Sequence, residues 1–302
     1  MDLIPKYKKE LQKFGLTPDY INKVFEVLRT IYAGQCGYYG AIFGYEFDES
    51  TKSESNILSQ LHLIYKGGTF LSKFNYINYI CTNEGNRLAS ELWKQYISVE
   101  EHKLWSVVRK YPKKLVAFWL KYVITFGSRP SSPILMYSKS ASTAIAYDIL
   151  KNQIINESIL NLCKDLVENG FAVISIDSVS TRGGELRDRQ YCMPREVATT
   201  LHSAYTQVNI DMDECKLYHL LLTYSNYNWT KEQFVEELNR SGLSEDKIRS
   251  AIEKTAKLGI TSNYTDSSLI PFLINDIDAY RNYLIEKYNH ALKDIINNIL
   301  YE

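Results

Sequence analysis

Three arginines surround a Gly-Gly pair in the middle of the chain: Arg182, Arg187 and Arg189. A guanidinium is always charged and donates hydrogen bonds in a planar fork, which suits phosphate groups. Gly183 and Gly184 supply the turn chemistry of a hairpin tip, so the three cations are expected on one loop. The alternative is a solvated charged hairpin, in which the arginines pair with Glu185 and Asp188.

Amide and hydroxyl side chains form a second set of candidate groups, because they donate and accept hydrogen bonds at once. They occupy the polar faces of two expected helices, at Asn56, Ser59 and Gln60 in one and at Asn156, Asn161 and Lys164 in the other. Lys66 and Lys73 follow the first helix and are candidate phosphate ligands. Every surface helix has a polar face, so an ordinary solvated surface is the alternative.

The residues that usually catalyse reactions or bind metals form no recognisable group. The five histidines stand singly, and the five cysteines include no C-x-x-C pair, so they are expected to be buried thiols. No phosphate loop, dinucleotide turn, H-E-x-x-H or G-x-S-x-G motif occurs, and the two D-x-D pairs lack a partner cluster. The sequence therefore predicts a protein that is not an enzyme and holds no metal or cofactor, with a metal nuclease as the minority interpretation.

Residues 152–205 contain the elements that would position the three arginines and the polar helix face of Asn156, Asn161 and Lys164. The segment NESILNLCKDLVENG predicts an amphipathic helix that Asn156 caps and Gly170 ends. FAVISI and QYCM predict the two strands of a hairpin with the arginines at its tip. PREVATTLHSAY predicts a closing helix that starts with Pro194.

The same order occurs twice more. Residues 53–97 give a helix SESNILSQLHLIYKG, a β-rich segment TFLSKFNYINYICT and a helix NEGNRLASELWKQY. The buried stripe of the first of these helices is expected at Ile57, Leu58, Leu61, Ile64 and Tyr65. Residues 230–288 give two helices joined through SGLS, with Ser244 as a cap, then a β segment and a long helix from Asn275. Between the first two regions, residues 104–126 predict a helix pair broken at Pro112.

This order of helix, turn, helix, two-stranded wing and closing helix resembles the winged-helix superfamily. The phrase YICTNEGNRLASELW is similar to a Y-x-L-T-x-E-G-x-x-L-A pattern at the wing strand of many prokaryotic winged-helix regulators. The matching residues are Cys81, Thr82, Glu84, Gly85, Leu88 and Ala89. The resemblance implies a mainly α chain with small β-hairpins, built as tandem winged-helix units over residues 1–97, 98–206 and 207–302.

Charge is balanced over the whole chain, with 35 basic and 35 acidic residues, so any surface for a polyanion must be local. Residues 1–97 carry 11 basic and 10 acidic side chains, residues 98–206 carry 14 and 10, and residues 207–302 carry 10 and 15. The middle third is therefore the best candidate for phosphate contact, and the acidic last third is a candidate surface for other proteins.

The resemblance implies that the chain docks on double-stranded DNA in transcription control, replication initiation or chromosome maintenance. In such proteins the second helix of the helix-turn-helix reads base edges, and wing cations hold phosphates. The alternative is a protein-interaction scaffold with little affinity for DNA.

A long apolar stripe is expected in residues 276–300, and it resembles the dimerisation helix of winged-helix regulators. We therefore expect a homodimer, with packing of this helix on its own chain as the alternative. No signal segment opens the sequence, and the most apolar stretch, residues 115–126, is interrupted by Lys121 and is too short to span a bilayer. A cytoplasmic protein without membrane contact is expected.

Overall fold

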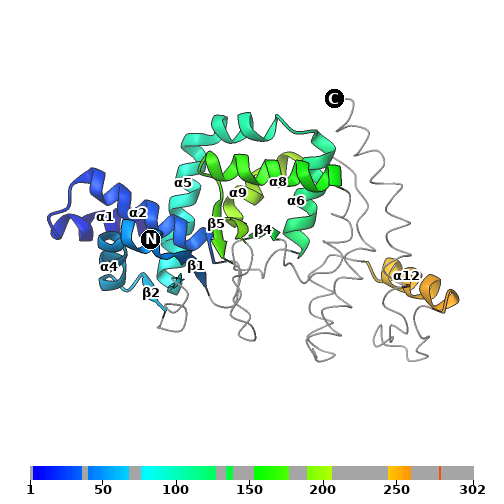
Figure 1. Cartoon of the computed structure of the whole chain (residues 1–302), viewed down its shortest axis with the longest axis horizontal. Helices are drawn as coiled ribbons and strands as arrows, with labels where there is room; N and C mark the ends of the chain where they lie inside the picture. Colours follow the sequence, from blue (N-terminus) through cyan, green and yellow to red (C-terminus); the bar gives the residue numbers. More distant parts are fainter. Residues whose placement is uncertain are drawn as a thin grey trace. The chain divides into compact units, whose positions relative to one another are not determined.

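A computed structural model describes eight parts of the chain (Figure 1): residues 3–35, 40–67, 76–126, 134–138, 153–176, 189–205, 244–259 and 279. Helices make up 70% of these residues and the strands form small antiparallel sheets, so the predicted mainly helical class is confirmed. The chain divides into two compact units, which are Met1–Ser140 with Ser158–Thr206 and Ala141–Glu157 with Gln207–Glu302.

The first three-stranded sheet and its helices come from residues 3–108. Their order is α1 (Leu3–Lys13), α2 (Pro18–Ala33), β1 (Ala41–Gly44), α3 (Tyr45–Ser50), α4 (Lys52–Gln60), β2 (Ile64–Lys66), β3 (Tyr76–Cys81) and α5 (Asn83–Val108). The last strand, β3, lies in the middle of the sheet and pairs antiparallel with β1 on one side and β2 on the other.

The core of this region follows from helical spacing and capping. Leu3, Tyr7 and Leu11 recur every four residues on α1 and are buried. Thr17 caps α2 by accepting a hydrogen bond from the backbone N–H of Tyr20, and Pro18 occupies the first turn, where its missing N–H costs nothing. The buried stripe of α2 then packs against α4, α5 and β3.

A second three-stranded sheet repeats this arrangement. Its elements are α6 (Lys113–Phe126), β4 (Ile134–Ser138), α8 (Gln153–Glu168), β5 (Val173–Ile176), β6 (Arg189–Met193) and α9 (Arg195–Tyr205). Again the last strand is central, in the order β4-β6-β5, and the predicted hairpin of FAVISI and QYCM is confirmed. We call residues 18–108 the first repeat and residues 113–205 the second repeat.

The turn that leads from α4 into β2 is a Schellman motif. The backbone N–H of His62 donates to the carbonyl of Ser59 (3.0 Å), and that of Leu63 donates to the carbonyl of Leu58 (2.9 Å). His62 adopts a φ of 53°, in the left-handed region. Leu58 and Leu63, which this motif brings together, are fully buried.

The turn from α8 into β5 has the same hydrogen bonds. Gly170 donates to the carbonyl of Val167 (3.0 Å), and Phe171 donates to that of Leu166 (2.8 Å). Gly170 has a φ of 83°, which confirms the predicted left-handed end of this helix. The two repeats therefore agree in strand order and also in the turn that enters the hairpin.

Helix α5 crosses the predicted boundary at residue 97. It is kinked at Glu100, whose φ of −99° and ψ of 15° are not helical, and it packs against both α2 of the first repeat and α9 of the second. The helix then ends at Val108, and α6 begins just after Pro112, so the predicted helix pair is confirmed.

Two predicted helix boundaries are wrong. The helix expected over residues 53–67 ends at Gln60, because Ile64 and Tyr65 pair with β3 as strand β2. Tyr65 is consequently 61% exposed, although it was expected in the buried stripe. Asn156 does not cap α8, since that helix already begins at Gln153.

Several elements lack a counterpart in the expectations from sequence: α1, α2, α3, β1 and β4. In the second compact unit, α12 (Glu245–Lys257) begins where expected, and the Ser244 hydroxyl accepts a hydrogen bond from the Lys247 N–H (3.4 Å). The bend at SGLS before Ser244 and the long helix from Asn275 lie outside the described residues, except for Ala279. Among the helices that the structure describes, none has the length and apolar character needed to cross a membrane.

Candidate nucleic-acid interface

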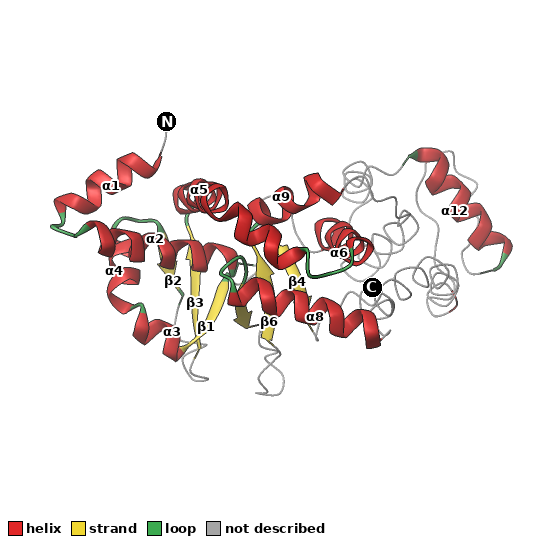
Figure 2. Ribbon diagram, turned by 90° about the horizontal axis from the view of Figure 1, so that it is seen from above, coloured by secondary structure: helices red, strands yellow, loops and turns green. Residues whose placement is uncertain are grey.

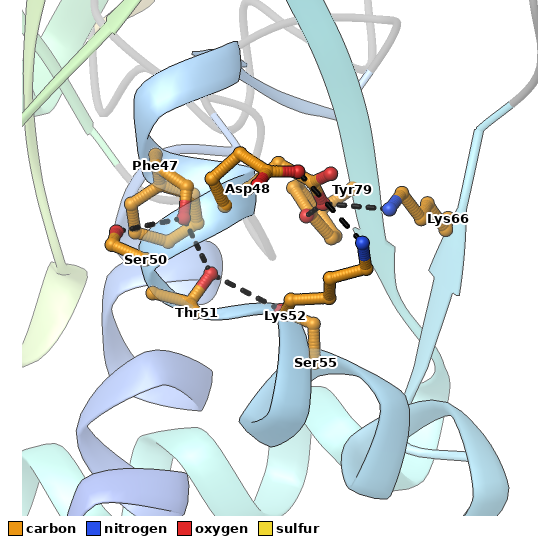
Figure 3. Close-up of polar contacts among 9 residues, drawn as sticks. Phe47, Asp48, Ser50, Thr51, Lys52, Ser55, Lys66 and Tyr79 are labelled. Carbon is orange, nitrogen blue, oxygen red and sulfur yellow. Dashed lines mark hydrogen bonds and ion pairs between the residues drawn. The ribbon is translucent and has the colours of Figure 1, made fainter.

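The corner between α3 and α4 is held by one carbonyl group. The Phe47 carbonyl accepts hydrogen bonds from the Thr51 N–H (3.0 Å), the Thr51 hydroxyl (2.7 Å) and the Ser50 hydroxyl (3.0 Å) (Figure 3). The Thr51 hydroxyl also lies 3.3 Å from the hydroxyl of Ser55, which is buried at the start of α4. These contacts fix the angle at which α4 leaves α3.

Aromatic contacts attach this corner to the sheet. The ring of Phe47 stacks on Phe43 of β1 with centroids 4.2 Å apart, and it meets the ring of Tyr79 edge-on at 6.0 Å. Tyr79 is completely buried on the central strand β3. The orientation of α4 therefore depends on side chains from β1 and β3.

A buried carboxylate completes the attachment. Asp48 of α3 is only 4% exposed and accepts hydrogen bonds from the Tyr79 hydroxyl and from the Lys66 ammonium, whose Nζ lies 2.6 Å away (Figure 3). Burial by itself raises the pKa of Asp48, but these two hydrogen bonds and the charges of Lys66 and Lys52 outweigh burial and leave the pKa below its ordinary value. The cluster thus holds an ionised carboxylate between α3, β2 and β3.

The outward face of α4 carries the predicted amide groups. Asn56 and Gln60 are exposed and lie four residues apart, so they share one face, whereas Ser59 is half-buried. Neither amide side chain makes a hydrogen bond to another described residue. Both remain open to a ligand.

Lysines near α4 have acidic neighbours. The Lys66 ammonium is ion-paired with Asp48. The Lys52 ammonium lies 3.8 Å from the Glu49 carboxylate, and the side chains of Lys52 and Glu49 are both largely exposed. Each lysine near this face therefore has part of its charge offset by a carboxylate.

The second repeat holds the other predicted residues. Asn161 and Lys164 are exposed on α8, and Asn156 lies within the same helix. Arg189 is the first residue of β6, where its backbone lies opposite Ile176. Three further predicted site residues lie outside the described residues: Lys73, Arg182 and Arg187. The structure thus divides the predicted site between α4 and β2 of one repeat and α8 and β6 of the other.

The contact between Asp48 and Tyr79 was not predicted from the sequence. They are 31 residues apart in sequence and meet only because α3 packs on β3. The segment YEFDES contains three acidic residues, Glu46, Asp48 and Glu49. Nothing in the sequence distinguishes Asp48, which becomes buried, from the other two.

The phrase YICTNEGNRLA proves to hold the first repeat together. The Thr82 hydroxyl accepts a hydrogen bond from the Gly85 N–H (3.0 Å) as the cap of α5, and it donates to the His62 carbonyl (2.9 Å). A Cβ atom on Gly85 would lie 2.0 Å from the carbonyl oxygen of Leu63, so only glycine fits there. Leu88 and Ala89, also in this phrase, are fully buried.

The cysteines in the described part of the chain lie in the core. Cys81, Cys163 and Cys192 are free and buried, as predicted, and burial raises the pKa of Cys81 and Cys163, which keeps both as neutral thiols. No group of three or more histidine, cysteine, aspartate or glutamate side chains that could hold a metal ion occurs among the described residues.

The fold is thus that of a mainly helical protein with two similar helix-and-sheet repeats. Comparison with known proteins finds no matching family, no matching curated sequence and no matching solved structure.

Proposed function

We propose that this chain is a non-enzymatic DNA-binding protein whose first and second repeats are winged-helix units that dock on duplex DNA. The observation that carries the proposal is the repeated order of helix, strand, a helical segment (α3 with α4, or α8), two strands and a helix, with the last strand central in both sheets. In each repeat a helix with an exposed polar face, α4 or α8, immediately precedes the hairpin. A helix in that position is the one that enters the major groove in helix-turn-helix proteins.

The proposal gives each predicted residue a role. Asn56 and Gln60 read base edges through their amides, and Asn161 and Lys164 act in the same way from α8. Phosphates are held by Lys73, Arg182 and Arg187 from the segments that join the paired strands, and by Arg189 at the start of β6. Lys66 contributes less to phosphate binding, because Asp48 already offsets its charge.

We also propose that residues 207–302 form a third winged-helix unit and that the chain self-associates through residues 275–302. The proposal places the protein in the cytoplasm, in transcription control, replication initiation or chromosome maintenance. Other proteins would bind the acidic last third, where phosphate is repelled.

The test is a selection from random duplexes followed by fluorescence-anisotropy titration of the enriched sequence at low and moderate salt. Asn56→Ala and Gln60→Ala should each relax base preference by about 1–3 kcal/mol at one position and leave folding unchanged. Gln95→Ala is the matched control, since Gln95 is an exposed glutamine on another helix of the first repeat. Equal loss of affinity on every sequence would exclude base reading by α4.

A protein-interaction scaffold is the second candidate. It is favoured by the acidic partners of Lys52 and Lys66, which leave the α4 face with little net positive charge. The same titration separates the two functions, because duplex binding driven by phosphates strengthens as salt is lowered. An affinity that is unmeasurable even at low salt would end the DNA proposal and leave the scaffold.

A further inference from the structure

The two repeats contact each other through a buried serine. The hydroxyl of Ser175 on β5 accepts a hydrogen bond from the Ile42 N–H on β1 (3.2 Å) and donates to the Ile42 carbonyl (3.1 Å). Ser175 and Ile42 are both buried. One side chain therefore satisfies both polar groups of a residue on the neighbouring sheet, which places β1 and β5 side by side.

A carboxylate forms the second contact. Glu196 of α9 accepts hydrogen bonds from the hydroxyl of Tyr32 on α2 (3.2 Å) and from the hydroxyl of Ser90 on α5. Burial raises the pKa of the Tyr32 hydroxyl, and the nearby Glu196 raises it further. The tyrosine therefore stays protonated and remains a donor to the second repeat.

Aromatic rings form the third contact. Tyr96 of α5 lies with its ring centroid 5.7 Å from that of Phe171, which is fully buried at the turn between α8 and β5. On its other side, the guanidinium of Arg29 from α2 lies 4.1 Å from the centre of the Tyr96 ring. Tyr96 thus connects helix α2 of one repeat with the hairpin entry of the other.

The register of the strands aligns the two hairpins. Ile42 lies opposite Asn78, near the start of β3, and Ser175 lies opposite Gln190, near the start of β6. The Ile42–Ser175 contact therefore brings the hairpin ends of both sheets to the same level, and Figure 2 shows β3 and β6 with these ends toward the same side. The start of β3 and the start of β6 therefore lie at the same edge of the two sheets.

From these contacts we infer that the two repeats act as one rigid reading body and that a single chain binds one continuous duplex with a two-part recognition site. This inference rests on the proposed function. The contacts come from a strand edge, from the helices α2, α5 and α9 around Glu196, and from a tilted pair of aromatic rings, so they restrain the repeats at different places. Joining two binding elements rigidly makes the second binding event intramolecular and fixes the spacing that the duplex must offer.

The experiment begins with the full chain and a library of random duplexes. We expect selection to enrich two sequence blocks at one spacing, with one chain for each pair of blocks by mass photometry, so that a self-associated dimer would occupy two such pairs. Inserting about five base pairs, half a helical turn, between the blocks should then weaken binding at least about tenfold. A single block, tolerance of the insertion, or a requirement for two chains on one pair of blocks would each overturn the inference while leaving DNA binding intact, whereas no duplex binding at all would overturn both.

Loosening the junction provides the second arm. The double variant Ser175→Ala with Glu196→Ala should reduce the penalty for the inserted base pairs to about threefold or less, because the repeats can then adjust to the new spacing. Ser106→Ala, an exposed serine on α5, is the control and should keep the full penalty. If the first variant does not fold, the double variant Tyr32→Phe with Ser90→Ala takes its place, because it removes only the two hydroxyl groups that donate to Glu196. An unchanged penalty in a folded junction variant would show that these contacts do not set the spacing.

Discussion

Asp48 shows how one buried residue can fix the position of a neighbouring helix face. Its carboxylate is buried against Tyr79 and bonded to Lys66, and it comes from the helix that directly precedes α4. Removing it leaves the Tyr79 hydroxyl without its acceptor and releases the Lys66 ammonium. The same residue therefore affects both the stability of the first repeat and the charge near the α4 face.

The first prediction concerns Asp48→Asn. At pH 7 it should lower the free energy of unfolding by about 1–3 kcal/mol, since a hydrogen-bonded charge is lost at a partly exposed pair. The folded pKa of Asp48 lies below its unfolded value of about 3.9, so this stabilisation is present above that pH and is lost as the pH falls through the folded pKa. Urea unfolding at pH 7 and pH 3 should therefore show a difference between the variant and the wild type that shrinks at pH 3.

The control for this series is Glu49→Gln, because Glu49 is exposed and lies 3.8 Å from Lys52. Its effect on stability should stay within about 0.5 kcal/mol at both pH values. A destabilisation by Asp48→Asn that does not change between pH 7 and pH 3 would contradict the role assigned to the ionised carboxylate.

The second prediction concerns the two left-handed turn residues. His62→Gly should raise the free energy of unfolding by up to about 1 kcal/mol, because glycine adopts positive φ without the Cβ clash that histidine meets. Gly170→Ala should destabilise, since its φ is 83° and an added Cβ would lie 2.9 Å from the Tyr96 hydroxyl. Thermal unfolding measures both variants. If the two melting temperatures move in the same direction, the two turns do not have equivalent roles.

At the scale of elements, the junction between α4, β2 and α5 is the most constrained part of the first repeat. The Leu63 carbonyl accepts from the Thr82 N–H (2.9 Å) and lies directly against Gly85. The Schellman turn and the start of α5 are therefore packed backbone to backbone. This packing explains why Thr82 follows the end of β3 and why a glycine, Gly85, stands in the first turn of α5.

The third prediction follows from that contact. Gly85→Ala should destabilise the protein by about 1–3 kcal/mol or more, because a Cβ at 2.0 Å from a carbonyl oxygen forces the backbone apart. Ser98→Ala, a change at an exposed position of the same helix, should leave stability nearly unaltered. Urea denaturation measures both, and a Gly85→Ala variant as stable as the control would show that α5 can shift without cost.

At the scale of the whole molecule, balanced charge limits where a polyanion can bind. The chain carries 35 basic and 35 acidic residues, and the excess of positive charge lies in residues 98–206. Any attraction for a polyanion must therefore come from a local group of cations, and the predicted group is the three arginines near the Gly-Gly pair, Arg182, Arg187 and Arg189.

The fourth prediction tests that group. Replacing Arg182, Arg187 and Arg189 together by alanine should weaken binding to all duplexes alike. It should also reduce the slope of log affinity against log salt concentration by the equivalent of up to about three phosphate contacts. Replacing Lys247, Arg249 and Lys257 of the acidic last third is the matched charge control and should change the salt dependence little. Equal slopes for the arginine variant and the wild type would remove the hairpin from the interface.

The sequence by itself determined the helical class, the hairpin of the second repeat, the Pro112 break and the caps at Gly170 and Ser244. Each of these depends on neighbouring residues, through apolar spacing, a rigid proline ring or a side chain bonded to its own helix end. Such local signals are legible in a single sequence.

Tertiary structure decided the features that depend on residues far apart. The end of α4 at Gln60 requires β3 to pair with residues 64–66 as a strand. The unpredicted strands β1 and β4 are as long as the predicted strands β5 and β6, so what defines them is their pairing with β3 and β6 across the chain. The Asp48 cluster and the Ser175 junction join residues 31 and 133 positions apart. A contact of this kind leaves no periodic pattern in the chain, because its energy comes from burial and from partners that only folding brings together.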